Sequence, residues 1–62
     1  MAKFEKMNED FGTELLHYGE IVFDYREEEE NSRYRLIEYN GFIYYHKMKD
    51  GEMDYCFKLI EE

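Results

Sequence analysis

Residues 39–57, YNGFIYYHKMKDGEMDYCF, contain two hairpin signals in close succession, and these signals define the predicted fold. Asn40-Gly41 and Asp50-Gly51 each separate two runs in which aromatic residues alternate with other residues. Asn-Gly and Asp-Gly are preferred in type I′ turns, whose two central residues both need a positive φ. The stretch therefore predicts three consecutive antiparallel strands, at about residues 33–39, 42–49 and 52–60.

A two-residue turn at Asp50-Gly51 also predicts the register of the second hairpin. Lys49 then faces Glu52, and Lys47 faces Asp54, so both pairs carry opposite charges. The same register gathers aromatic and apolar residues on the other face of the hairpin. That face comprises Phe42, Tyr44, His46, Met48, Met53, Tyr55, Phe57 and Leu59.

The turn at Asn40-Gly41 extends both faces onto the preceding strand. It pairs Ile37 with Tyr44 on the first face and Leu36 with Tyr45 on the second. The tyrosines divide accordingly between a core side and an open side. We expect Tyr39, Tyr44 and Tyr55 on the core side, and Tyr25, Tyr34 and Tyr45 on the open side.

Residues 20–26, EIVFDYR, predict a further strand, with EEEENS as its exit loop. If this strand pairs with residues 33–39, Asp24 lies opposite Arg35 and Tyr25 lies beside Tyr34. The chain would then form a four-stranded antiparallel meander.

The N-terminal third shows a helical periodicity. Phe4, Met7, Phe11, Leu15 and Tyr18 are spaced by three or four residues. Gly19 follows as a helix stop. The spacing predicts a helix over about residues 3–18, and the alternative is a short helix ending at Gly12 with a longer strand from Thr13. The fold class is thus α+β, a single domain over residues 1–62, in which the helix packs on the Phe42, Tyr44 and Phe57 face of the meander.

The composition limits the classes of function. Sixteen acidic residues outweigh eight basic ones, for a net charge of −8. Phosphate binding needs clusters of Lys and Arg, so we expect no direct contact with nucleic acid. The apolar runs are too short for a membrane helix, which favours a soluble, cytoplasmic protein with no membrane partner. Residue types with AT-rich codons suggest a phage or a low-GC bacterium, which places the protein in the host cytoplasm if a phage encodes it.

Signals for catalysis are weak. His17 and His46 show no metal-ligand spacing, and Cys56 has no CxxC partner. We expect His46 to be a structural histidine near Tyr55 and Arg35, and Cys56 to be a small buried hydrophobe beside Tyr45. The chain has no glycine-rich phosphate loop and no nucleophile elbow. The sequence therefore predicts a protein that is not an enzyme and binds no cofactor or metal.

The four consecutive glutamates, Glu27 to Glu30, have two interpretations. The first is a solvated turn whose charge discourages aggregation of an aromatic sheet. The second is an acidic surface presented to a basic partner. On an extended strand, Glu28 and Glu30 would be about 6.6 Å apart and would imitate a row of phosphates, with Asp24 nearby.

These features predict a protein that binds other proteins. Small inhibitors that mimic nucleic acid share this acidic, compact, sheet-rich composition, and many are encoded by phages. We expect such an inhibitor, which blocks the basic surface of a DNA- or RNA-handling enzyme. The expected contact residues are Asp24, Tyr25, Glu27, Glu28, Glu29, Glu30, Tyr34, Leu36 and Tyr45.

Two alternatives remain open. One is a homodimeric structural or regulatory subunit, which associates through the open side of the sheet and involves no mimicry. The other is an acidic subunit that binds a basic protein without imitating nucleic acid.

Overall fold

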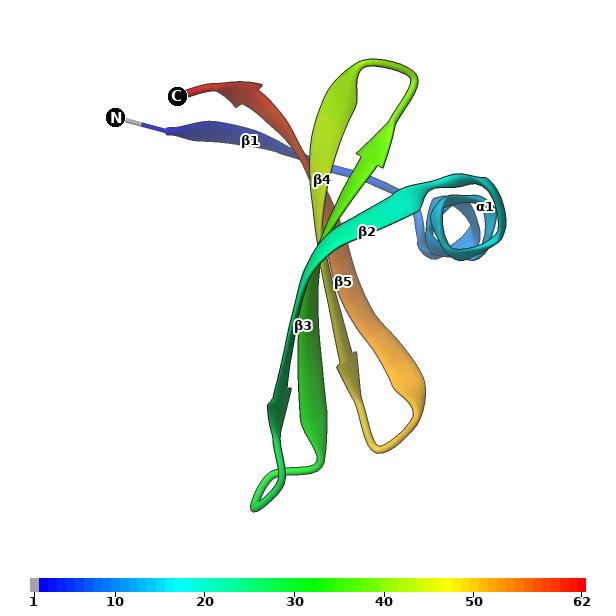
Figure 1. Cartoon of the computed structure of the whole chain (residues 1–62), viewed down its shortest axis with the longest axis vertical. Helices are drawn as coiled ribbons and strands as arrows, with labels where there is room; N and C mark the ends of the chain where they lie inside the picture. The colour runs from blue at the N-terminus through cyan, green and yellow to red at the C-terminus, as the bar shows by residue number, and fades with distance from the viewer. Residues whose placement is uncertain (1) are drawn as a thin grey trace.

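The computed structural model describes residues 2–62, apart from the side chain of Asp54. Its elements, in chain order, are β1 (Lys3–Lys6), α1 (Glu9–Tyr18), β2 (Glu20–Glu27), β3 (Ser32–Tyr39), β4 (Phe42–Lys49) and β5 (Glu52–Glu61). The five strands form one twisted antiparallel sheet in the order β1-β5-β4-β3-β2, and α1 lies on one side of it (Figure 1). The α+β class is confirmed. The prediction of four strands is wrong, because the N-terminal segment adds a fifth.

The predicted helix over residues 3–18 is wrong in its first part. Residues Lys3–Lys6 form β1, in which Phe4 pairs with Leu59 and Lys6 with Phe57 at the end of the sheet. Pairing with β5 satisfies backbone groups that would otherwise be left at an open sheet edge, and this outweighs the helical spacing of the apolar residues. The two chain ends consequently lie side by side (Figure 1).

Helix α1 begins at Glu9 and ends at Tyr18, so the alternative of a helix ending at Gly12 is also wrong. Gly12 lies inside the helix, where it is about 1 kcal/mol less favourable than Ala. Its lack of a side chain lets α1 approach β5, because a Cβ at Gly12 would lie 1.8 Å from Cε of Met53. Gly19 stops the helix as predicted, and its N–H donates to the carbonyl of Leu15 at 2.8 Å.

Both predicted turns are confirmed. Asn40 and Gly41 have φ values of 51° and 83°, and Asp50 and Gly51 have values of 54° and 79°. These are the paired positive φ angles of type I′ turns. Between β3 and β4 the predicted register holds along the whole hairpin, from the Tyr39–Phe42 pair onward.

The register between β4 and β5 is only partly as predicted. Lys49 pairs with Glu52 and Met48 with Met53, but the register then shifts by one residue between Met48 and Lys47. β5 thus holds one extra residue between Met53 and Tyr55, a β-bulge. Every later residue of β5 lies on the opposite face from the one expected.

The bulge changes which residues enter the core. Cys56 lies opposite His46 on the helix side, while Phe57 lies opposite Tyr45 on the other side. The expected placement of Tyr55, Phe57 and Leu59 on the core side is therefore wrong. Lys47 lies opposite Tyr55, so the expected Lys47–Asp54 pair does not follow the observed register, and the side chain of Asp54 lies outside the described part.

The core between α1 and the sheet is small. Its buried hydrophobic members, among the described residues, are Leu15, Ile37, Tyr44 and Cys56. Phe11 of α1 packs at its margin, with its ring centroid 5.1 Å from that of Tyr44. The predicted packing of α1 on the Tyr44 side is confirmed. A domain of this size buries a limited share of its surface, so each core contact makes a large relative contribution to stability.

The predicted pairing of β2 with β3 is confirmed. Asp24 lies opposite Arg35 and Tyr25 opposite Tyr34. The connecting loop is shorter than EEEENS, because Glu27 still belongs to β2 and Ser32 already belongs to β3. A second bulge, between Ile21 and Phe23, bends the start of β2.

We expect Gly19→Ala to lower the free energy of unfolding by about 1–3 kcal/mol, the usual range for overpacking. The new Cβ would lie 2.4 Å from Cγ2 of Ile37 and 2.6 Å from the carbonyl oxygen of Leu15. The φ of Gly19 is −82°, so the cost is steric rather than conformational. Urea denaturation measures the loss. Thr13→Ala, at an exposed position of the same helix, is the control with an expected change below about 0.5 kcal/mol; equal stability of the two variants would contradict the prediction.

Candidate functional site

Two hairpin loops meet at one end of the molecule. The N–H of Asp50 donates to the carbonyl of Asn31 at 2.9 Å, and the Nδ2 of Asn31 donates to Oδ1 of Asp50 at 3.3 Å. These bonds hold the turn of residues 28–31 against the Asp50-Gly51 turn. The carboxylates gathered there, which we call the acidic pole, are those of Glu27, Glu28, Glu29, Glu30, Asp50 and Glu52.

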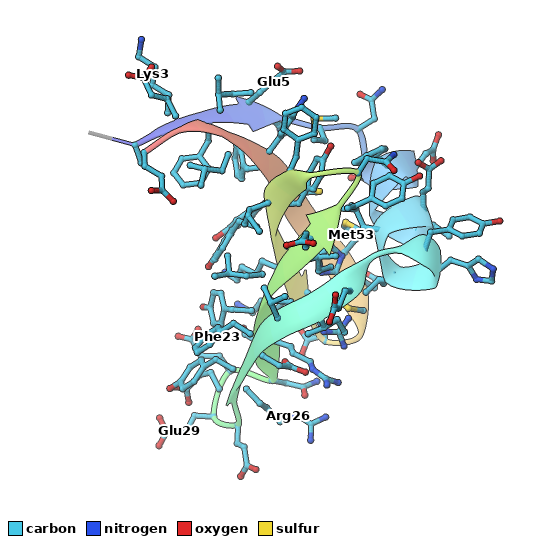
Figure 2. The ribbon with its side chains drawn as sticks, turned by 45° about the horizontal axis from the view of Figure 1, so that its top comes forward. Lys3, Glu5, Phe23, Arg26, Glu29 and Met53 are labelled. Atoms are coloured by element: carbon cyan, nitrogen blue, oxygen red, sulfur yellow. The ribbon has the colours of Figure 1, made fainter. Side chains whose placement is uncertain are left out.

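The glutamates of the acidic pole do not form an extended row. Residues 28–31 form a turn, closed by the N–H of Asn31 donating to the carbonyl of Glu28 at 3.2 Å. The expected spacing of an extended strand for Glu28 and Glu30 is therefore wrong. The Glu29 side chain points outward at the tip of the hairpin (Figure 2), while its N–H donates to Oε1 of Glu27 at 3.2 Å. The turn therefore does not hold the carboxylates at the spacing of an extended strand.

Asp24 lies apart from the acidic pole. Its carboxylate accepts hydrogen bonds from Arg33, with a distance of 2.9 Å between Nε and Oδ1, and Nε of Arg35 lies 3.9 Å from the same oxygen. The hydrogen bonds from Arg33 hold the pKa of Asp24 below its usual value. The expected grouping of Asp24 with Glu28 and Glu30 is therefore wrong, because Asp24 is engaged in an ion pair on the helix side of the sheet.

The side of the sheet away from α1, which we call the open face, carries a ladder of aromatic rings. The successive ring centroids are 6.0, 6.2, 5.9, 5.2 and 6.3 Å apart. The ladder crosses all five strands. Its members, in order, are Tyr25, Tyr34, Tyr45, Tyr55, Phe57 and Phe4.

The open face combines these rings with lysine side chains. The Nζ of Lys47 lies 5.4 Å from the ring centroids of both Tyr34 and Tyr55, within the range of cation–π attraction. Burial among the rings, together with the Tyr55 side chain, raises the pKa of Tyr45 to about 12. Tyr45 therefore stays a neutral hydrogen-bonding group at any physiological pH.

An open depression of about 680 Å³ lies at the β1 end of this face. Its lining is mostly aromatic and comprises Phe4, Lys6, Tyr45, Tyr55 and Phe57. Phe23, at the other edge, also points away from the helix and is 55% exposed (Figure 2). The open face is thus an extended apolar surface, of the kind that marks an interface.

Several expected contact residues do lie together. Tyr25, Tyr34, Leu36 and Tyr45 all belong to the open face, and the hydroxyl of Tyr25 lies 3.4 Å from Oε2 of Glu27 at the border of the acidic pole. Tyr55, Phe57 and Phe4 also belong to the open face, where they were not expected. No residue signalled the bulge that places Tyr55 and Phe57 there. Phe4 between charged neighbours was a signal for a half-exposed strand.

The buried side chain of His46 lies on the helix side of the sheet, opposite Arg35. His46 is fully buried, and neither of its ring nitrogens has a hydrogen-bond partner among the described residues. Burial, and to a smaller extent the charge of Arg35, lower the pKa of His46. The expected neighbour Arg35 is confirmed, whereas Cys56 takes the place expected for Tyr55. The imidazole is therefore neutral and adds no catalytic group to the surface.

Cys56 is also buried, as expected, although on the helix side rather than beside Tyr45. Burial raises the pKa of its thiol to about 11, which leaves it protonated and unreactive. Among the described side chains, no three His, Cys, Asp or Glu residues converge as metal ligands. Within residues 2–62, no helix has the length and apolar character required to cross a membrane.

Comparison with known proteins gives no relative. No family model matches the chain, and neither a curated protein nor a solved structure is similar to it. The acidic pole and the open face are therefore the features from which a function can be inferred.

We expect the protein to lose stability as the pH falls below about 6.5, the pKa of histidine in an unfolded chain. Because the pKa of His46 is lowered in the folded state, the unfolded chain takes up this proton first, and protonation favours unfolding. The His46 imidazole therefore lowers the free energy of unfolding below that pH and does not affect it well above that pH. Urea denaturation between pH 7.5 and 5.5, a range above most carboxyl titrations, measures the slope.

His46→Leu should remove most of this slope. The matched control is His17→Gln, at an exposed position of α1, which should retain it. A slope of equal size in the protein and in His46→Leu would contradict the assignment to His46.

Proposed function

We propose that this protein binds a basic surface of another protein through its acidic pole and blocks nucleic acid from that surface. The observation that carries the proposal is the hydrogen-bonded contact between Asn31 and Asp50, which brings two acidic turns together. With a net charge of −8, the chain is attracted to basic surfaces and repelled by DNA and by anionic membranes. The partner is of the class of DNA- or RNA-handling enzymes, and the protein itself is an inhibitor rather than an enzyme.

The tyrosines next to the acidic pole support contact beyond simple charge attraction. Tyr25 and Tyr34 lie at the border of the pole and present rigid rings with hydroxyl groups. Such side chains dominate binding energy when a partner covers them. A phage-encoded inhibitor acting in the host cytoplasm fits this chemistry, since it needs neither a cofactor nor a metal.

The turn conformation of the glutamates refines the mode of mimicry. Because Glu28, Glu29 and Glu30 occupy a turn, they do not present negative charge at the regular spacing of one strand. The proposed mimicry is therefore of the charge density of nucleic acid rather than of its repeat. Charge density alone accounts for most non-specific binding of proteins to DNA.

The test replaces Glu27, Glu28, Glu29 and Glu30 by Gln. It measures how well the variant competes with nucleic acid for the partner proteins that the unaltered protein binds. We expect the variant to lose at least about tenfold in affinity, since several charge-assisted contacts disappear. Binding by the unaltered protein should weaken as salt rises. The matched control neutralises the same number of acids elsewhere, at Glu9, Glu38, Glu61 and Glu62. Equal binding by both variants would contradict a role for the acidic pole.

A second candidate function rests on the ring ladder. A homodimeric structural or regulatory subunit would cover the open face of each copy with that of the other, without any mimicry. Four half-buried apolar residues at the centre of this face are Leu36, Ile43, Tyr45 and Phe57. Contact of this kind depends on apolar area, so it responds weakly to salt.

Replacing Tyr34 and Tyr45 by Thr tests this second candidate. Thr retains β propensity while removing two adjacent rings from the ladder. We expect self-association through the open face to weaken at least about tenfold, with little change on raising salt. Sedimentation analysis of both proteins at two salt concentrations gives the result. Unchanged association would exclude the open face as the contact.

A further inference from the structure

Strand β2 is a long and exposed edge of the sheet. It has eight residues, and within residues 2–62 it pairs with β3 alone, so its outer side carries unpaired backbone groups. Its side chains include Ile21, Val22, Phe23 and Tyr25, which are 45%, 51%, 55% and 50% exposed. The other edge, β1, has only four residues and carries Lys3, Glu5 and Lys6. Short, charged edges resist pairing, whereas long apolar edges invite it.

The backbone groups that β2 offers can be identified from the hairpin register. The residues that flank a two-residue turn form a hydrogen-bonded pair, and bonded and non-bonded pairs then alternate. Counted from the Tyr39–Phe42 pair, Ile37 and Arg35 bond toward β4. The residues between them on β3 therefore bond toward β2.

On β2, the partners of these β3 residues are Phe23 and Tyr25. The backbone N–H and C=O groups of Phe23 and Tyr25 are thus hydrogen-bonded to β3. The N–H and C=O groups of Asp24 and Arg26 consequently point outward, where a further strand can bond to them.

The charges of Asp24 and Arg26 distinguish among the registers centred on residues 24, 25 and 26. A two-fold axis that joins two β2 edges makes them antiparallel, and the outward groups of Asp24 and Arg26 must then bond across the axis. An axis at Asp24 sets Asp24 against Asp24 of the second copy, and an axis at Arg26 sets two arginines together. An axis at Tyr25 instead pairs Asp24 with Arg26 of the second copy, twice. Opposite-charge pairs stabilise a sheet and like-charge pairs destabilise it.

Arg26 is suited to this pairing. In the β2–β3 pair, Arg26 lies opposite Arg33, a residue of the same charge. Arg33 already binds Asp24, whereas no ion pair joins Arg26 to any side chain in the described part of the molecule. In the dimer, Asp24 of each copy would lie between Arg33 of its own chain and Arg26 of the second copy.

We propose that the protein forms a two-fold dimer through β2, with Tyr25 on the axis and Asp24 of each copy opposite Arg26 of the other. The two sheets then form one continuous sheet of ten strands. Tyr25 of each copy lies in a non-hydrogen-bonded pair, in which side chains are closest. The ring ladder of one copy therefore continues into that of the other. The proposal stands independently of the acidic pole.

The first experiment is sedimentation equilibrium of the full chain from micromolar to millimolar concentration at physiological ionic strength. We expect a monomer–dimer equilibrium. Arg26→Glu should weaken the dimer at least about tenfold, because two ion pairs become two like-charge pairs. Arg26→Lys is the matched control and should retain the dimer. Circular dichroism confirms that both variants fold, which the exposed position of Arg26 favours. A monomer throughout the range would overturn the proposal.

A second experiment locates the axis. Tyr25→Cys places two thiols at a non-hydrogen-bonded pair about 4.5 Å apart between Cα atoms, within disulfide reach. We expect rapid oxidation to a covalent dimer. Phe23→Cys is the control and should oxidise more slowly, because residue 23 lies opposite residue 27 in this register. The native Cys56 is 1% exposed and does not interfere. Equal rates for the two variants, or a dimer that survives Arg26→Glu and is lost on removing Tyr34 and Tyr45, would overturn the edge pairing.

Discussion

One extra residue in β5, between Met53 and Tyr55, determines how the two faces of the sheet are divided. Upstream of this bulge the β4–β5 pairing follows from the Asp50-Gly51 turn. Downstream, every side chain of β5 changes face, because the side-chain period of a strand is two. Cys56 thereby enters the core under α1, and Tyr55 and Phe57 join the open face. Without the bulge, α1 would have to pack against two bulky rings in place of a cysteine.

This division explains why the molecule has a small core and a large aromatic surface. Leu15, Ile37, Tyr44 and Cys56 are the buried hydrophobic residues, and Gly12 allows α1 close to β5. The rings of the open face compensate in part, because neighbouring aromatic pairs each contribute about 0.5–1.5 kcal/mol beyond the area that they bury. On the core side, His46 lowers the stability of the fold, because its imidazole is buried and has no hydrogen-bond partner in the described part of the chain. Buried polar groups of this kind lower stability and make it depend on pH.

The surfaces that remain are chemically distinct and lie on different parts of the fold. The acidic pole belongs to two turns, the ring ladder to the open face, and the unpaired backbone groups to the β2 edge. A basic partner, a second copy face to face and a second copy edge to edge would each use a different one. Tyr25 links the three regions, because it lies on β2, starts the ladder and contacts Glu27 at the border of the acidic pole. A partner bound at any of the three regions would therefore change the surroundings of the Tyr25 side chain.

The local geometry of the meander is encoded in short stretches of sequence. Asn40-Gly41 and Asp50-Gly51 specify type I′ turns through the backbone, so the turns, the β3–β4 register and the split of Tyr34 from Tyr44 were predictable. The position of Asp24 opposite Arg35 was one register among several, because no turn signal sets the length of the loop before β3. The bulge in β5, the pairing of residues 3–6 with β5 and the contact of Asn31 with Asp50 arise only in the folded chain. Each of these depends on a balance between segments distant in sequence, namely the space under α1, an open sheet edge and the twist that brings two loops together, and no local pattern of residues encodes that balance.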